Sequence, residues 1–214
     1  MTAKLIWATP DADRMIAEIA RVSNPDNQKN PNIEGLLNYM MREGHVSPFE
    51  MANACIEVTT TRDIGRQILR HRSFQFQEFS GRYQVYNKLP KVQYRECRLQ
   101  DKVNRQNSLP TDDENLVQAW NDAQDTVQQL ARETYAWAIR SGIAKEQARV
   151  ILPEGLTSSR LYINGNFRSW VHYLKSRLHP STQKEHRDIA VEILAILRGI
   201  APITMNAFFN NETI

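Results

Sequence analysis

The sequence has few cysteines and no long apolar run, and each absence excludes a class of protein. Cys55 and Cys97 are the only cysteines in 214 residues. They are too few for a disulfide framework or a four-cysteine zinc site, and the five histidines show no metal-ligand spacing with them. We therefore expect free thiols and no structural metal.

The N-terminal stretch lacks the regions of a signal peptide, and no stretch has the roughly 20 apolar residues of a membrane span. These absences predict a soluble, cytoplasmic protein without a membrane partner.

A strong charge imbalance is absent as well. The chain has 27 lysines and arginines against 24 aspartates and glutamates, a net charge of +3. It therefore lacks the overall cationic bias of a general nucleic-acid binder, and any anion site must be local. With 214 residues, 41% of them hydrophobic, the chain can bury one sizeable core but not two. We expect a single domain that spans residues 1–214.

Hydrophobic periodicity predicts an α+β fold with many helices. Strands are expected at residues 4–8, 54–60 and 158–166, and the last of these is an edge or a central strand. Helices are expected at residues 11–23, 33–43, 62–72, 113–141, 145–153, 167–178 and 182–200. The last helix should turn these side chains inward: Ile189, Ile193, Leu194 and Leu197. From residue 73 to residue 110 the periodicity fades, which is typical of an irregular segment that carries function.

The stretch "LRHRSFQFQEFSGRYQ", residues 69–84, is rich in hydrogen-bond donors. Arg70, His71 and Arg72 are consecutive where a helix gives way to a loop, so their side chains can fan around an anion, and guanidinium groups match phosphate oxygens in paired bonds. Seven residues later, Ser80-Gly81-Arg82 offers a hydroxyl and curved backbone that suit a second phosphate. The stretch therefore predicts two anionic ligands side by side. The alternative is an exposed basic loop that pairs with Glu78 and solvent.

The longer pattern resembles the signature of the flavin-dependent thymidylate synthases, the ThyX family. The pattern is Arg-His-Arg, then seven residues, then Ser-Gly-Arg-Tyr. Six of its residues, namely Arg, His, Arg, Ser, Arg and Tyr, match the family signature at the same spacing. Chance would give such a match in a chain of this size roughly once in 10^5 to 10^6. The blocks "ARVSNP", "HVSPFE", "QARVILP" and "NFRSWVHYLKSR" follow in the family's order, so the resemblance covers nearly the whole chain. It implies one α+β domain with a central, mostly antiparallel sheet flanked by helices.

The resemblance also implies an activity and its partners. FAD is reduced by NADPH, methylenetetrahydrofolate supplies a carbon, and dUMP becomes dTMP. A homotetramer with active sites at subunit interfaces is expected, without a nucleic-acid partner. Such a site must hold several phosphates beside a flavin, which gives the arginine-rich stretch a purpose.

By similarity, the site residues divide between the two larger ligands. The FAD contacts would be Ser47, Arg70, His71, Arg72, Glu78, Asn166, Arg168 and His172. The dUMP contacts would be Gln67, Arg70, Glu78, Phe79, Ser80, Gly81, Arg82, Arg149 and Arg177. Arg177 matches the family's catalytic arginine, which polarises uracil and favours the form ionised at N3, because a fixed cation stabilises the negative charge on the ring.

Several of these residues have a plainer interpretation. On a helix, Arg149 and Arg168 can pair with a nearby glutamate such as Glu146, or extend along apolar surface to reach water. Ser47 precedes a proline and suits a turn. His172 stands where many relatives carry asparagine, and a packed helix histidine explains it as well. Gln75 and Gln77 also replace the family's usual serine and asparagine, so the loop can differ in detail.

Two other functions compete with the enzyme. A non-catalytic nucleotide or single-stranded nucleic-acid binding module would use the same arginines with four aromatic rings as stacking surfaces. Those rings are Phe74, Phe76, Phe79 and Tyr83. A structural protein that assembles through the helix at residues 113–141 would leave the arginine-rich stretch unexplained.

Cys97 raises the question of a cysteine nucleophile, which the unrelated folate-reducing thymidylate synthases use. It lies between Arg95 and Arg98, a setting that favours a thiolate. The Pro-Cys-His context of that other family is absent from this sequence. We therefore interpret Cys97 as an ordinary thiol.

Overall fold

The computed structural model describes residues 1–89, 92 and 94–209. Four strands form an antiparallel sheet in the order β1-β2-β6-β3. They are β1 (Thr2–Ala8), β2 (Asn53–Thr61), β6 (Ser158–Asn166) and β3 (Gln75–Glu78). β2 and β6 pair along their full length, from Asn53 opposite Asn166 to Thr61 opposite Ser158. The predicted α+β fold is confirmed, and β6 is a central strand.

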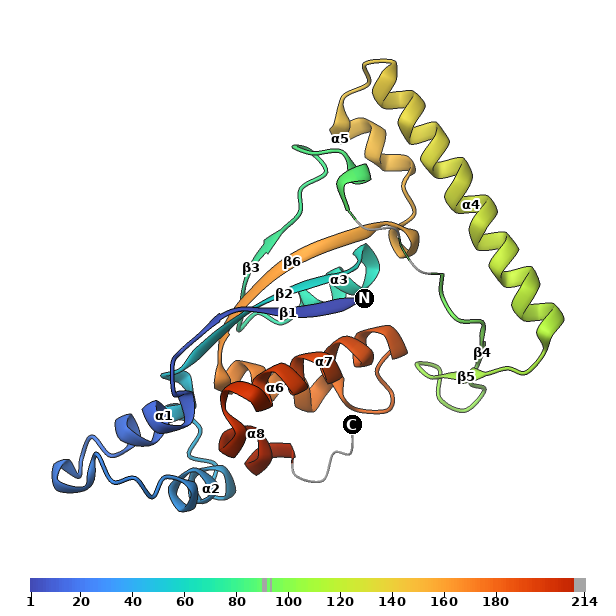
Figure 1. The fold of residues 1–214 in the computed structure, drawn as a ribbon. Helices are drawn as coiled ribbons and strands as arrows, with labels where there is room; N and C mark the ends of the chain where they lie inside the picture. The colour runs from blue at the N-terminus through green and yellow to red at the C-terminus, as the bar shows by residue number, and fades with distance from the viewer. Residues whose placement is uncertain (90–91, 93, 210–214) are drawn as a thin grey trace.

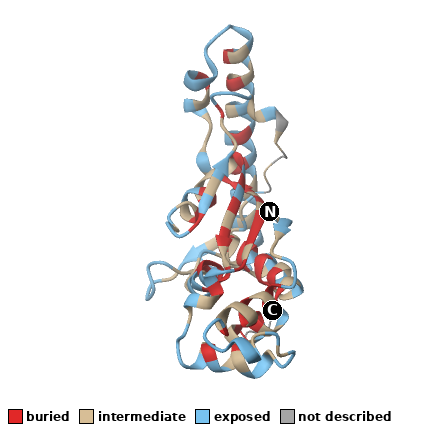
Figure 2. Ribbon diagram, turned by 90° about the vertical axis from the view of Figure 1, so that its left-hand side faces the viewer, coloured by how far each residue is buried: buried red, intermediate tan, exposed pale blue. Residues whose placement is uncertain are grey.

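Helices cover the sheet and close the core (Figure 1). They are α1 (Ala12–Ala20), α2 (Glu34–Arg42), α3 (Arg62–Ile68), α6 (Phe167–Arg177), α7 (Lys184–Ile200) and α8 (Pro202–Phe209). Buried residues gather in the sheet and in the helices packed beneath it (Figure 2). The predicted inward side chains of the last long helix are all buried: Ile189, Ile193, Leu194 and Leu197. α8 was not predicted; Pro202, whose fixed φ suits a first helical position, begins it.

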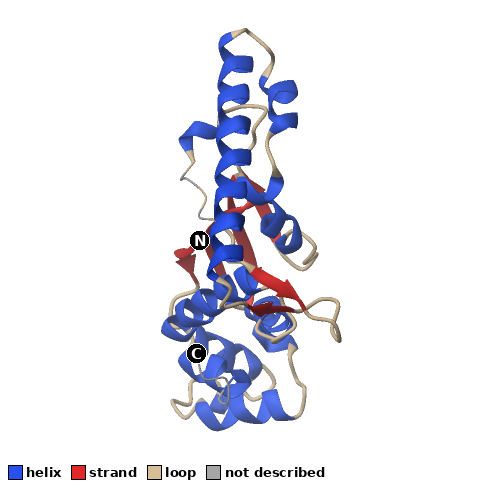
Figure 3. Ribbon diagram, turned by 90° about the vertical axis from the view of Figure 1, so that its right-hand side faces the viewer, coloured by secondary structure: helices blue, strands red, loops and turns tan. Residues whose placement is uncertain are grey.

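A long helix, α4 (Glu114–Arg140), runs beside the sheet and extends beyond it (Figures 1 and 3). Asp113 caps its start by accepting a hydrogen bond from the backbone N–H of Leu116 at 3.0 Å. The short helix α5 (Lys145–Ala148) returns along the far end of α4. Many apolar side chains of α4 remain exposed, including Trp120, Val127, Leu130 and Trp137. The predicted helix is therefore present, but the residues that the structure describes leave much of its apolar face uncovered.

The segment expected to be irregular contains short strands. β3 lies within it, and β4 (Arg98–Gln100) and β5 (Ser108–Pro110) form a separate two-stranded sheet. These strands span three or four residues each, too few for alternation to stand out against the polar sequence around them. The prediction of an irregular backbone over residues 73–110 is therefore corrected at these strands.

Arg95 fixes this segment to the rest of the fold. Its guanidinium group contacts both carboxylate oxygens of Asp63 at 2.9 and 3.0 Å and the hydroxyl of Thr61 at 2.6 Å. It also forms an ion pair with Glu185 of α7 at 3.2 Å. Its backbone carbonyl accepts from the side chain of Gln124 on α4 at 3.0 Å. One residue therefore joins the sheet, α4 and α7.

Candidate active site

The centre of the candidate site is a contact between His71, just beyond α3, and Arg177, the last residue of α6. Nε of Arg177 donates to Nε2 of His71 at 2.9 Å. Burial and the adjacent Arg177 charge, with a smaller effect of His172, lower the pKa of His71 to about 4. The imidazole is therefore neutral and can accept this hydrogen bond. Among the described residues no carboxylate pairs with Arg177, so its positive charge is not compensated.

An aromatic cluster holds the His71 ring in place. The ring meets Tyr173 edge-on at 5.0 Å between centroids, and Phe74 lies beside it. Phe74 is buried and packs so closely on β6 that a Cβ on Gly165 would lie 2.2 Å from the Phe74 ring. The candidate histidine is thus fixed by the core.

The same packing removes the stacking surface required by the nucleic-acid alternative. Phe74 belongs to the core, Phe76 packs against it, and Phe79 contacts the Tyr86 ring at 5.5 Å between centroids. Only Tyr83 of the proposed four rings is exposed, at 85% of its surface. The aromatic side chains therefore do not form an open row of rings.

Arg70 and Arg72 flank His71 and are exposed. Neither guanidinium group forms an ion pair or a hydrogen bond with another side chain in the part of the chain that the structure describes. The alternative of a basic loop paired with Glu78 is not observed, since Glu78 accepts a hydrogen bond from the hydroxyl of Ser159 at 2.7 Å. Both guanidinium groups are therefore available to an anionic ligand.

A second group of predicted flavin contacts lies where β6 passes into α6. Asn166 caps α6 by accepting from the backbone N–H of Ser169 at 2.8 Å, which leaves its amide nitrogen free to donate. Arg168 pairs with Glu50, in the same 3-10 turn, Ser47–Glu50, that exposed Ser47 begins. His172 follows one turn later on α6 and is exposed, so it is not a packed core histidine.

The predicted phosphate loop lies beyond the other end of β3. The backbone of Ser80 accepts from the N–H groups of Tyr83 and Gln84 at 3.1 and 3.2 Å, which closes a turn. Arg82 forms an ion pair with Glu146 of α5 at 3.3 Å. Arg149, three residues further on, is half-buried and, within the described ranges, does not pair with Glu146 or another carboxylate. The loop and Arg149 therefore share one corner of the molecule.

Gly81 is required by packing and not by curvature. Its backbone is outside the left-handed region, which Gly44 and Gly142 adopt. A Cβ at Gly81 would lie 2.4 Å from the Tyr86 ring, whose hydroxyl accepts from Arg62 at 2.5 Å. The expectation that this glycine serves tight curvature is thus corrected.

Gly81→Ala should destabilise the protein by about 1–3 kcal/mol, the usual cost of an overpacked site, and weaken nucleotide binding by moving the loop. Urea unfolding and dUMP titration measure the two effects. Gly199→Ala is the matched control, because a Cβ there meets nothing within 4 Å and alanine suits a helix. Equal stability of the Gly81→Ala variant and the unchanged protein would contradict the packing role.

The predicted site residues fall at two ends of the β3–β6 pair. The phosphate loop follows Phe79, whose backbone N–H donates to the backbone carbonyl of Arg160 at 2.9 Å. At the other end of β3, the backbone carbonyl of Ser73 accepts from the hydroxyl of Ser169 at 3.1 Å, which places the Arg70–Arg72 turn near Asn166. Six residues of extended strand separate Arg160 from Asn166, about 20 Å. Within one chain, the Arg70–Arg72 and Ser80–Arg82 parts of the stretch therefore lie beyond opposite ends of β3. We call these regions the phosphate end and the flavin end.

Some residues of the site were not predicted from the sequence. Glu50 and Glu146 hold Arg168 and Arg82, and Tyr173 and His186 lie behind His71. Tyr173 precedes Arg177 by one helical turn, so its position on the same face was available from spacing. The other contacts join residues far apart in the chain, which no local pattern shows.

Cys97 is not surrounded by free positive charge. Arg95 is engaged by Asp63 and Glu185, and Arg98 donates to the side chain of Ser108 at 2.8 Å. The thiolate interpretation relied on these two arginines. Their carboxylate and hydroxyl partners favour the ordinary thiol.

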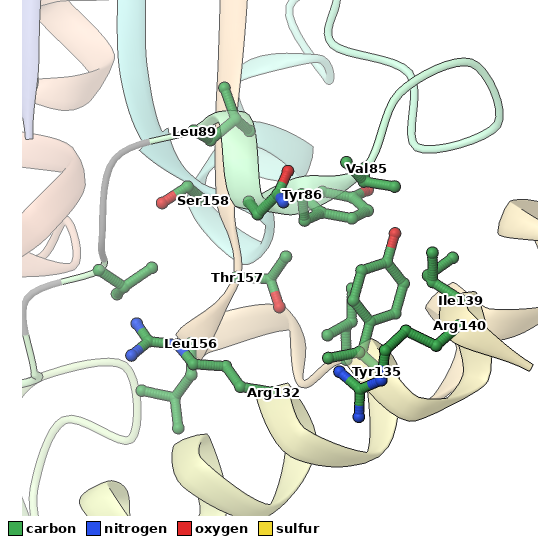
Figure 4. A pocket seen from close by; sticks show the side chains of 14 residues that line it. Val85, Tyr86, Leu89, Arg132, Tyr135, Ile139, Arg140, Leu156, Thr157 and Ser158 are labelled. Carbon is green, nitrogen blue, oxygen red and sulfur yellow. The ribbon is translucent and has the colours of Figure 1, made fainter.

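A cavity of about 550 Å³ lies beside the phosphate end, between α4 and the segment that follows the loop (Figure 4). Tyr86 and Tyr135 face it together with Arg132 and Arg140 of α4.

Across residues 1–89, 92 and 94–209, we find no group of His, Cys, Asp and Glu side chains that could hold a metal ion. None of the described helices is long and apolar enough to span a membrane.

Comparisons with known proteins identify the family. The family model described as "Thymidylate synthase complementing protein" matches residues 4–203. A flavin-dependent thymidylate synthase of Synechocystis is 51% identical over 177 residues, 83% of this chain and 80% of that one. A probable flavin-dependent thymidylate synthase of Paramecium bursaria Chlorella virus 1 is 44% identical over 198 residues, 89% and 90% of the two chains.

A solved structure agrees with these relatives. The UMP/dUMP methylase PolB from Streptomyces cacaoi, bound with 5-Br dUMP, superposes with a TM-score of 0.85 and 28% identity. The superposition covers 98% of this chain and 94% of that one. The chain therefore belongs to the family of flavin-dependent thymidylate synthases and is an enzyme.

Proposed function

We propose that the enzyme converts dUMP to dTMP by reductive methylation, with FAD, NADPH and methylenetetrahydrofolate. The observation that carries the proposal is the contact of Arg177 with neutral His71 at 2.9 Å. A carboxylate partner would cancel the arginine's charge, whereas an imidazole positions it and leaves it in place. A cation beside uracil stabilises the form ionised at N3, which makes C5 a better nucleophile. The dUMP methylase neighbour and the flavin-dependent relatives support this assignment.

The flavin end fits FAD by the chemistry of its side chains. The unpaired guanidinium groups of Arg70 and Arg72 suit a diphosphate, and the free amide nitrogen of Asn166 suits a carbonyl acceptor. Ser47, Arg168 and His172 would complete this surface. Bound FAD would supply the reducing equivalents, drawn from NADPH, that turn the transferred carbon into a methyl group.

The nucleotide would use both ends of the strand pair. Arg149 and the Ser80 hydroxyl suit the phosphate of dUMP, and Arg82 would bind it in exchange for its present partner Glu146. Gln67, Arg70 and Arg177 present donors at the other end that suit the carbonyl groups of the base. Because the phosphate loop and the Arg70–Arg72 turn lie beyond opposite ends of β3, we infer that the phosphate and the base of one nucleotide are held by different copies of the chain.

We propose that the enzyme is a homotetramer whose active sites join the flavin end of one copy to the phosphate end of another. The exposed apolar side chains of α4 suit such contacts. Co-expression of Arg177→Ala and Arg82→Ala chains should restore part of the activity that each variant lacks alone, because some interfaces then join two intact ends. Light scattering gives the assembly mass; a monomer, or no restored activity in mixed assemblies, contradicts this arrangement.

An absorbance spectrum tests the chemistry directly. The purified protein, with added FAD if needed, should show an oxidised flavin that NADPH bleaches, and NADH provides the comparison. Addition of dUMP and methylenetetrahydrofolate should then yield dTMP, measured by chromatography. Omission of each component in turn assigns its role. A protein that binds no FAD, or makes no dTMP with all components present, contradicts the proposal.

A further inference from the structure

A row of hydrogen bonds lies behind Gln67, which the proposed function places against the base of dUMP. Its amide oxygen is 3.2 Å from Nδ1 of His186, and its amide nitrogen donates to Gln183 at 2.8 Å. His186 is fully buried, and its Nε2 is 3.1 Å from the hydroxyl of Tyr173. Gln183 in turn donates to Glu185 at 2.9 Å. The row therefore joins a buried tyrosine to a carboxylate through Gln67.

The Glu185 end of this row fixes the direction of every bond in it. The Glu185 carboxylate only accepts, and Arg95 holds it at 3.2 Å. The amide nitrogen of Gln183 must face that carboxylate, so the oxygen of Gln183 faces the nitrogen of Gln67. The oxygen of Gln67 must then face a donor, which is Nδ1–H of His186.

The far end of the row agrees with this direction. Burial raises the pKa of Tyr173, so its hydroxyl keeps a proton to donate to Nε2 of His186. Burial also lowers the pKa of His186 to about 3, with Arg177 and His71 adding to the effect. A neutral imidazole has one ring proton, and when that proton is on Nδ1 the Tyr173 hydroxyl can donate to Nε2. The Tyr173 end is thus compatible with the orientation of the Gln67 amide that the Glu185 end requires.

We propose that His186 is a positioning residue that, together with Gln183 and Glu185 at the other end of the row, makes Gln67 present an N–H donor, and not its amide oxygen, to the base. This inference rests on the proposed function, because Gln67 meets the base only if dUMP is the substrate. One hydrogen of the Gln67 amide nitrogen is used by Gln183. The second has no acceptor among the residues that the structure describes. A donor there selects a carbonyl oxygen of uracil and disfavours an amino group at the same place.

Two substitutions at His186 separate this role from simple packing. The shorter His186→Asn places its amide nitrogen near the position of Nδ1 and keeps the donor to Gln67. The longer His186→Gln reaches the position of Nε2 and loses that donor. We expect His186→Gln to raise the KM and the dissociation constant for dUMP roughly tenfold, with kcat within about twofold. His186→Asn should stay within about twofold of the unchanged protein in all three.

Tyr173→Phe provides a second variant that keeps the ring and the fold. Without the hydroxyl, the proton of His186 can move to Nε2, so the KM for dUMP should again rise, by roughly threefold. In a Gln67→Ala background, His186→Gln should have no further effect on the dissociation constant for dUMP, while its effect on stability remains. A packing role predicts additive effects instead.

Nuclear magnetic resonance of the histidine side chains tests the inference without substrate. The spectrum should show His186 protonated at Nδ1 alone. Protonation at Nε2, equal KM values for His186→Asn and His186→Gln, or additive effects with Gln67→Ala would each overturn the positioning role. If the unchanged protein neither binds nor methylates dUMP, the proposed function fails instead, whichever tautomer the spectrum shows.

Discussion

Arg177→Ala should lower turnover by about 10^2- to 10^3-fold while FAD remains bound. The side chain gives the site a fixed positive charge, and loss of one preorganised electrostatic group typically has an effect of this size. His71 keeps its place against Tyr173, so the flavin end should survive the substitution. Arg177→Lys should recover only part of the rate, because a lysine keeps the charge but not the fixed planar geometry at His71.

Single-turnover measurements with bound FAD separate the chemical step from binding, and the flavin absorbance reports occupancy. Arg187→Ala is the matched control. Arg187 is half-buried on the neighbouring helix α7 and donates to the backbone of Pro180 at 2.9 Å, away from the contacts of His71. Unchanged turnover of Arg177→Ala, or an equal loss in both variants, would remove the catalytic role of Arg177.

Local sequence patterns predicted the longer helices and strands of the fold, but not α8, the short strands or the partners of the apolar faces. The last long helix, α7, shows buried Ile189 and Leu197 where its apolar spacing placed them. On α4 the same kind of spacing marks Trp120 and Leu130, yet both are exposed. Periodicity shows that a helix has an apolar face. It does not show whether this chain or another copy covers that face.

The candidate site divides in the same way. The resemblance indicated Arg177 and His71, and the structure brings them into contact across a separation of 106 residues. Pairings such as Arg82 with Glu146 depend on the tertiary arrangement of exposed side chains, for which the sequence carries no local signal. The strand β3 was also missed. Its four residues keep the phosphate end away from the flavin end, which leads directly to the proposal of a shared site.

Arg95→Met should have the largest effect on stability, a loss of about 3 kcal/mol in the free energy of unfolding. The Arg95 side chain is only 14% exposed and lies between Asp63 and Glu185. Removal of one partner from a largely buried ion pair leaves the remaining charges unpaired. Methionine keeps much of the side-chain volume, so the loss reports charge and hydrogen bonding more than packing. For a chain of this length, the melting temperature should fall by roughly 6–12 °C.

Arg14→Met is the matched control for Arg95→Met. Arg14 also pairs with two carboxylates, Asp11 and Glu18, but its side chain is 60% exposed. Exposed pairs contribute about 0–1 kcal/mol, so this variant should unfold at nearly the same urea concentration as the unchanged protein. The difference between the two arginines isolates the effect of burial.

Since Arg95 also holds Glu185, which directs the hydrogen bonds to Gln67, the Arg95→Met variant that still folds should bind dUMP more weakly. Equal stability losses at Arg14 and Arg95 would show that Arg95 is an ordinary surface pair and does not fix the segment to the fold.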